Sequence, residues 1–211
     1  QGTSGGWSYT PGLDAWVPKE SGNAGDYRLN TVREAKGALG GTTDIKVDQF
    51  EFNPDPFVLN NVLVTNTTAI TQIYSVLVGL PTTFAAPNLI SGTVTTSVID
   101  GGGGGASIST VGTPLPNGTP IYQALIDGVT VQTLQNNPFS VVVPGSGAAS
   151  ASFGPLANAV PVTANIGILL SFQLTAGDTA AILSRFDVVP EPSTLFLASL
   201  IIALTTIFRR R

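Results

Sequence analysis

The sequence contains no histidine, no cysteine and no methionine. It therefore holds no imidazole or thiolate metal ligand, no Ser-His-Asp triad and no cysteine nucleophile, and we expect no cofactor, no metal and no enzymatic activity. The lack of methionine, also at position 1, predicts that the chain beginning at Gln1 is a processed product from which any secretory signal peptide has been removed.

Charged residues are also scarce, at 10% of the chain against about 25% in typical proteins. Nine Lys and Arg face thirteen Asp and Glu, and residues 47–184 contain no basic residue. A nucleic-acid-binding protein needs a basic surface that displaces counterions from phosphates, so we expect no nucleic-acid partner. Low charge leaves strand edges with little Lys to protect them, which favours self-association.

What the chain has instead is typical of a turn-rich all-β protein: 24 Gly, 15 Pro and 43% hydrophobic residues in 211. Segments rich in Val, Ile, Thr and Phe alternate with clusters of Gly, Pro, Asn and Asp, and Asp127-Gly128 predicts a two-residue hairpin turn. This pattern predicts an antiparallel β-sandwich of jelly-roll or immunoglobulin-like type, with a closed barrel as the alternative. The predicted strands are 46–52, 57–67, 70–80, 92–99, 106–111, 121–126, 129–134, 139–143, 148–153, 165–175 and 180–188.

The strongest strand pattern lies in residues 165–175. Apolar residues alternate there with mostly polar ones, which predicts one buried face and one solvent-facing side. The residues of the predicted buried face are Ile166, Ile168, Leu170, Phe172 and Leu174.

Residues 1–45 read as an irregular segment packed on a main domain of residues 46–188. Thr31 and Glu34 have the spacing of a helix capping box, which predicts one short helix there. Trp7, Trp16 and Tyr27 are candidates for stacking on sugar rings, although such aromatics more often anchor the open end of a sandwich.

Residues 189–211 form a segment of three parts. Pro190, Glu191 and Pro192 come first, residues 195–208 carry no charge and are apolar on all faces of a helix, and Arg209–Arg211 end the chain. Fourteen residues span roughly 21 Å, short of a hydrocarbon core of about 30 Å, so length alone favours a core helix. The arginines lengthen the span by snorkelling and act as a membrane stop, so we expect a single C-terminal transmembrane helix with the β-domain outside.

These three parts, in this order, resemble the PEP-CTERM sorting signal. The resemblance covers about a tenth of the chain and implies that exosortase, a membrane-embedded transpeptidase-like enzyme, recognises Pro190, Glu191 and Pro192. It further implies secretion across the inner membrane, transient anchoring by the tail, cleavage near the motif, and release or attachment at the cell surface. It assigns no activity to the β-domain.

Two other motifs point to sites less strongly. The glycine run 101–105 lacks the Lys-Ser/Thr of a phosphate-binding loop, so we expect a flexible connection between strands. Asp48, Glu51 and Asp55 could hold Ca²⁺ or supply an acid and a base, but Asp48 and Glu51 would project from opposite faces of a strand, so a solvated edge is the preferred interpretation.

Asn66-Thr67-Thr68 and Asn117-Gly118-Thr119 fit the glycosylation sequon, which carries little weight if the host is bacterial. Taken together, these patterns indicate a secreted, non-enzymatic structural or adhesive protein of a bacterial extracellular matrix. The alternatives are a carbohydrate-binding module that contacts extracellular polysaccharide and a surface hydrolase built on carboxylates alone.

Overall fold

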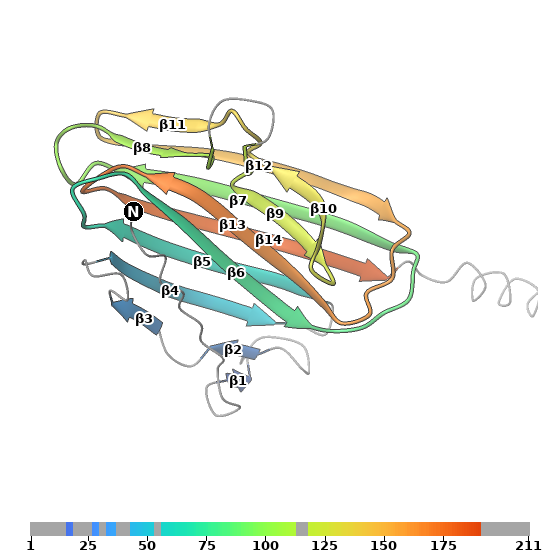
Figure 1. The fold of residues 1–211 in the computed structure, drawn as a ribbon. Helices are drawn as coiled ribbons and strands as arrows, with labels where there is room; N and C mark the ends of the chain where they lie inside the picture. The colour runs from blue at the N-terminus through green and yellow to red at the C-terminus, as the bar shows by residue number, and fades with distance from the viewer. Residues whose placement is uncertain are drawn as a thin grey trace, which may run out of the picture.

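The computed structural model describes residues 16–18, 27–29, 33–36, 43–52, 56–112 and 118–190, and describes side chains within 56–112 and 118–189. Every regular element in these residues is a β-strand, and the strands form two antiparallel sheets (Figure 1). The described part of the chain is therefore all-β, as the sequence predicted.

Within the described residues the larger sheet has eight strands. Among the described strands, β3 (Arg33–Lys36) pairs with β4 alone, at one end of the sheet. The other strands follow in the order β1 (Trp16–Pro18), β2 (Tyr27–Leu29), β4 (Thr43–Phe52), β5 (Phe57–Asn66), β14 (Thr179–Pro190), β7 (Asn88–Ile99) and β12 (Ser146–Asn158).

The smaller sheet has six strands in the part of the chain that the structure describes. β6 (Gln72–Pro81) pairs with one side of β13 along its whole length, while β9 and β8 share the other side. The remaining order is β10 (Val129–Leu134), β9 (Tyr122–Ile126), β13 (Asn165–Leu174), β8 (Ala106–Ser109) and β11 (Ser140–Val143).

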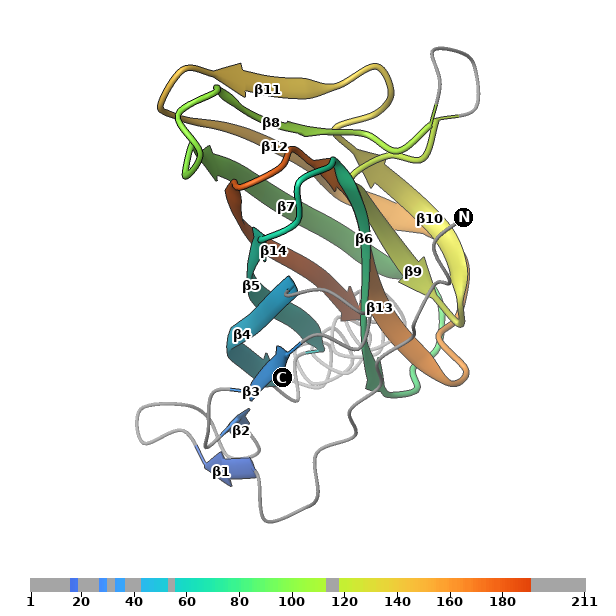
Figure 2. The same ribbon diagram turned by 60° about the vertical axis from the view of Figure 1, so that its left-hand side comes forward.

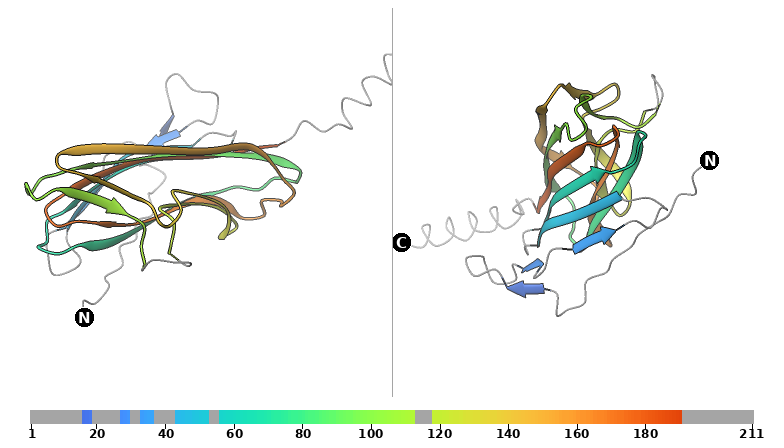
Figure 3. Two further views of the ribbon diagram at one scale, coloured as in Figure 1. Left: turned by 90° about the horizontal axis from the view of Figure 1, so that it is seen from above. Right: turned by 90° about the vertical axis from the view of Figure 1, so that its left-hand side faces the viewer.

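The hydrophobic core lies between the two sheets, which form separate layers in the end-on view (Figure 3). Alternate residues of each strand enter this core because successive side chains point to opposite faces of a sheet. The predicted buried face of β13 is confirmed, since all five of its apolar residues are fully buried. The architecture is thus sandwich-like and not a closed barrel.

The predicted strands from residue 46 onward are all present, with ends that shift by a few residues. The largest changes are at β12, which continues to Asn158, and at β7, which begins at Asn88. Asp127 and Gly128 form the predicted turn between β9 and β10, with φ angles of 51° and 79°. Local alternation and turn residues were sufficient to locate these elements.

The short helix predicted after Thr31 is not found, because residues 33–36 form β3 instead. Arg33 pairs with Val47 and Lys36 pairs with Asp44 on β4. A capping box is a local signal, and pairing with the edge of a sheet overrides it. β1, β2 and β3 lie beyond β4 and extend the larger sheet (Figure 2).

Candidate functional site at the end of the last strand

The Pro-Glu-Pro motif begins at the last residue of β14. β14 lies inside the larger sheet, paired with β5 on one side and with β7 on the other. Pro190 is still in register with Asn88 of β7, and the Val188 amide donates to the Pro56 carbonyl at 2.9 Å. The sheet therefore holds the chain in place up to the first residue of the motif.

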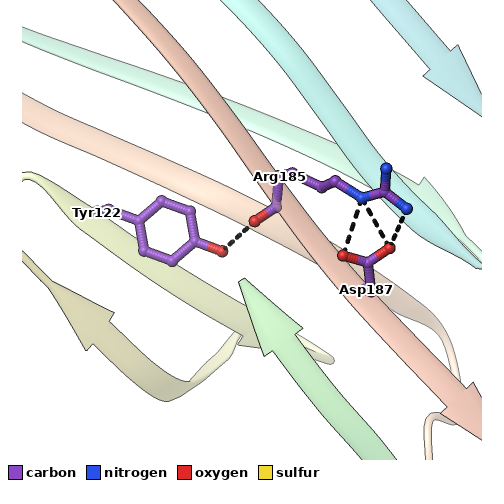
Figure 4. A network of polar contacts seen from close by, with 3 residues as sticks. All are labelled: Tyr122, Arg185 and Asp187. Carbon is purple, nitrogen blue, oxygen red and sulfur yellow. Dashed lines mark hydrogen bonds and ion pairs between the residues drawn. The ribbon is translucent and has the colours of Figure 1, made fainter. Parts of the chain in front are cut away.

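An ion pair lies on the outer face of β14, just before the motif (Figure 4). Arg185 Nε donates to both carboxylate oxygens of Asp187, at 2.8 and 2.9 Å. The Arg185 guanidinium also lies 4.5 Å from the ring centroid of Phe57 on β5. Residues two apart on a strand share a face, which is why this pair forms. Arg185 is the one basic residue among those whose side chains the structure describes.

A buried tyrosine contacts the same strand from the inside. Tyr122 of β9 donates its hydroxyl to the Arg185 carbonyl at 2.9 Å, so a side chain of the smaller sheet is tied to the backbone of the larger one (Figure 4). Burial, with a smaller contribution from the charge of Asp187, raises the pKa of Tyr122 well above its usual range. The phenol therefore stays protonated and remains a donor.

Gly92 of β7 makes room for this contact. A Cβ at position 92 would lie 2.7 Å from the Tyr122 hydroxyl and 2.4 Å from Cε1 of Phe153. Real Cβ atoms essentially never come this close to another heavy atom. The missing side chain is thus what allows the phenol to reach the backbone of β14.

Two asparagine side chains lie near the point where the chain leaves the sheet. Asn88 is fully buried and donates from Nδ2 to the Val160 carbonyl at 3.1 Å. Asn158 donates to the Asn88 side-chain oxygen at 2.8 Å and to the same Val160 carbonyl at 2.9 Å. These bonds join the start of β7, the end of β12 and the following loop, so this end of the sandwich is well connected.

The glycine run between β7 and β8 is organised around a carboxylate. The amides of Gly102, Gly103 and Gly105 donate to Asp100 at 3.0, 2.6 and 2.8 Å. The bond from Gly105, followed by those from the other glycines, lowers the pKa of Asp100. The run connects β7 to β8, as expected, and it folds around Asp100, whose carboxylate occupies the amides that a phosphate would use.

Asp127 plays a similar part at the opposite end of the sandwich. Its carboxylate accepts the amides of Thr163, Ala164 and Asn165 at 2.9, 2.7 and 2.9 Å, and the Thr163 hydroxyl at 2.7 Å. The Asn165 amide and then the two Thr163 groups lower the pKa of Asp127 well below its usual range. One carboxylate thereby fixes the loop before β13 to the β9–β10 turn.

Asp178 completes the set of carboxylates whose side chains the structure describes, with Asp100, Asp127 and Asp187. It is buried, accepts the Gly101 amide at 3.3 Å and is hydrogen-bonded by the Thr175 hydroxyl. Within 56–112 and 118–189, each carboxylate is therefore bonded to groups of the same chain. No group of three or more acidic side chains that could hold a metal ion occurs in this part of the chain.

The sequon at Asn66 is buried in the fold. Asn66 is fully buried, and its Nδ2 donates to the carbonyls of Ile70, Leu174 and Thr175 at 2.9, 2.9 and 3.0 Å. Its Oδ1 accepts the Thr68 amide and hydroxyl at 3.1 and 2.7 Å. The sequence match at Asn66 thus reflects a structural asparagine that ties β5 to the end of β13. Asn117 of the other sequon lies outside the described residues.

Most of the sequence-predicted site residues lie outside the part of the chain that is described with side chains. Trp16 and Tyr27 belong to the backbone of β1 and β2, and Asp48 and Glu51 to that of β4. The register of β4 against β5 shifts between Val47 and Gln49, which interrupts the simple alternation assumed for Asp48 and Glu51. The residues outside the described ranges are Trp7, Asp55, Glu191, Pro192, Arg209, Arg210 and Arg211.

The described part of the chain thus defines a class, an antiparallel sandwich-like β-domain. The sequence matches no protein-family model, and no curated protein is significantly similar to it. The described residues include no helix that is long and apolar enough to cross a membrane. Residues 195–208, where the transmembrane helix is predicted, lie outside them.

Proposed function

We propose that the chain is a secreted, surface-sorted, non-enzymatic structural or adhesive protein of a bacterial extracellular matrix, processed by exosortase. In this proposal a sandwich of jelly-roll or immunoglobulin-like type is the cargo, and residues 195–208 are a transmembrane helix that anchors it until cleavage. The observation that carries the proposal is the three-part segment 189–211, whose motif starts at the last residue of β14.

The surroundings of β14 support a division of labour between domain and tail. β14 is paired with β5 as far as Asp187 and with β7 as far as Pro190, so the sheet's contacts with β14 are made before the tail begins, and we expect the domain to stay folded whether the tail is present or removed. A membrane-embedded enzyme could therefore act on the motif without unfolding the domain. The three arginines resist translocation while the apolar run partitions into the bilayer, which would place the motif at the outer surface of the inner membrane.

The use of the described carboxylates supports a non-enzymatic domain. A general acid and base must reach a substrate, whereas Asp100, Asp127 and Asp178 accept hydrogen bonds from nearby backbone and hydroxyl groups, and Asp187 pairs with Arg185. These contacts stabilise loops and turns. They favour a structural role over a hydrolase built on these residues.

Processing would also change the charge of the protein. The uncut chain has a net charge of −4. Cleavage after Pro192 removes three arginines and no acidic residue, which leaves six basic and thirteen acidic residues and a net charge of −7. The released domain would be more acidic and without its apolar segment, and both changes favour solubility.

The test is a Glu191→Ala substitution in a host that carries exosortase. The variant alters neither the apolar run nor the arginines, so it should enter the membrane like the unaltered chain, but a shortened secreted product should not form. Ser193→Ala, two positions further on, is the matched control and should be processed normally.

Fractionation and intact mass distinguish the outcomes. Equal release of a shortened product from Glu191→Ala and from the unaltered chain would contradict recognition of Glu191 and leave an ordinary C-terminal anchor. If the uncut forms of the unaltered chain, Glu191→Ala and Ser193→Ala were all absent from the membrane fraction, the C-terminal anchor itself would be contradicted.

A further inference from the structure

β6 is a ten-residue edge strand with one unpaired side. It pairs with β13 from Gln72 to Pro81 without a register shift, and no other strand in the described part of the chain pairs with it. It contains no charged residue, and its one proline is at the end. Long, uncharged edges of this kind bind further strands unless charge, proline or a bulge blocks them.

Backbone hydrogen bonds beyond the end of β6 show which of its backbone groups are turned outward. Phe84 and Val162 exchange both of their backbone hydrogen bonds, at 3.0 Å each, and the Thr82 amide donates to the Ala164 carbonyl at 3.0 Å. These pairs continue the unbroken register of β6 against β13, and the direction of backbone hydrogen bonding alternates along a strand. The amides and carbonyls of the even-numbered residues of β6 are therefore hydrogen-bonded to β13. The amides and carbonyls of Ile73, Ser75, Leu77 and Gly79 point to the open side.

The same alternate residues place apolar side chains on the outer face of the sheet. Ile73 is 62% exposed and Leu77 is 67% exposed, and the small residues Ser75 and Gly79 are exposed beside them. Free backbone groups and exposed apolar side chains thus occur on the same residues. A partner strand could engage both together.

We propose that β6 binds β6 of a second copy of this chain, antiparallel and about a two-fold axis at Ser75. In this register Ile73 lies opposite Leu77 of the other copy, Leu77 lies opposite its Ile73, and the two Ser75 residues face each other. Each of these three pairs exchanges two backbone hydrogen bonds, and both exposed apolar side chains gain an apolar neighbour.

A second copy of this chain suits this edge better than a charged partner strand does. The strand offers no charge for a partner to pair with. Ile73 and Leu77 lie four residues apart, so that in an antiparallel pair of two β6 strands each can face the other, which makes the edge complementary to itself. The contact joins two six-stranded sheets into one continuous sheet. It does not depend on the sorting tail, although association of copies would serve the matrix role proposed above.

Because the chain has no cysteine, one introduced cysteine reports the register directly. In the proposed dimer the Cα atoms of two residues at position 75 are about 5.5 Å apart, within disulfide range. Ser75→Cys should therefore form a disulfide-linked dimer on mild oxidation. Gly79→Cys lies on the same edge and face, but its two copies would be roughly 26 Å apart at about 3.3 Å per residue, so it should not. Ser97→Cys, on the outer face of the larger sheet, controls for random collision.

The full chain is used in a mild detergent with micelles in large excess, so that the apolar run does not bring two copies together. We expect the Ser75→Cys dimer to form at least tenfold faster than either control dimer. Adding Leu77→Lys to Ser75→Cys should remove this advantage, because the charge would lie against Ile73 of the other copy.

Equal cross-linking at positions 75 and 79, or none at 75, would overturn the proposal. So would a chain that stays monomeric while the amides of Ser75 and Leu77 are protected from hydrogen exchange, because another segment of the same chain would then occupy the edge. If the dimer fails while Glu191→Ala still blocks processing, only this contact is lost and the sorting proposal stands.

Discussion

Substitutions at Gly92 and Tyr122 test how the two sheets are joined. Gly92→Ala adds a methyl group whose carbon would lie 2.7 Å from the Tyr122 hydroxyl and 2.4 Å from the Phe153 ring. Both rings must move, and the bond from Tyr122 to the Arg185 carbonyl, now 2.9 Å, is lost or lengthened. Tyr122→Phe removes the same bond but leaves the ring in place.

The magnitudes follow from the two effects. Overpacking a dense core costs about 1–3 kcal/mol, and a lost buried hydrogen bond costs about 1 kcal/mol more. We expect Gly92→Ala to lower the free energy of unfolding by about 2–4 kcal/mol, and Tyr122→Phe to lower it by about 1–2 kcal/mol. The double variant should lose less than the sum of the two, by about 1 kcal/mol, because both single changes break the same bond.

Urea unfolding of the full chain in mild detergent, followed by far-ultraviolet circular dichroism, measures these values. Gly79→Ala is the control, since its Cβ would meet nothing closer than 3.7 Å, and it should range from no change to a gain of about 1 kcal/mol. Strictly additive losses at positions 92 and 122 would refute the shared contact. A Gly92→Ala variant as stable as the Gly79→Ala control would refute the packing argument altogether.

Two further substitutions test the buried and clustered polar groups. Asp127 has a lowered pKa in the folded state. Its contribution to the free energy of unfolding is therefore complete above the unfolded-state pKa of about 3.9 and is lost as the pH falls below that value. Asp127→Asn should therefore be less stable at pH 7 and lose less stability than the unaltered chain between pH 5 and 2.5; parallel urea-midpoint curves would contradict this. Asn66→Asp, which sets a carboxylate oxygen against three backbone carbonyls, should cost more than about 3 kcal/mol at neutral pH. A thermal unfolding midpoint within about 2 °C of the original would exclude that cost.

The sequence by itself determined the local elements of this protein. Alternation along β13 and the Asp127-Gly128 turn depend on neighbouring residues only, so the strand, its buried face and the hairpin were predictable. The three-part segment at the C-terminus is likewise a local pattern, and the sorting hypothesis rests on it.

Tertiary structure decided everything that depends on residues far apart in the chain. β3 is a strand because β4 offers it an edge, against a local helix signal. Asn66 looks like a glycosylation acceptor in sequence, but in the fold it is fully buried and its side-chain amide donates to carbonyls more than 100 residues away. Gly92 has no local motif, and the close approach of Phe153 from β12 and of Tyr122 from the other sheet explains it.

The open edge of β6 also appears only in the fold. Its sequence resembles that of any buried strand, with Ile73 and Leu77 among several apolar residues. In the described part of the chain β6 pairs with β13 on one side only, which leaves the backbone groups of one set of alternate residues open, and the packing of the other face on the core leaves the side chains of that same set outward. Which apolar residues serve the core and which serve a partner therefore depends on sheet order, and sheet order is a long-range property that local periodicity does not contain.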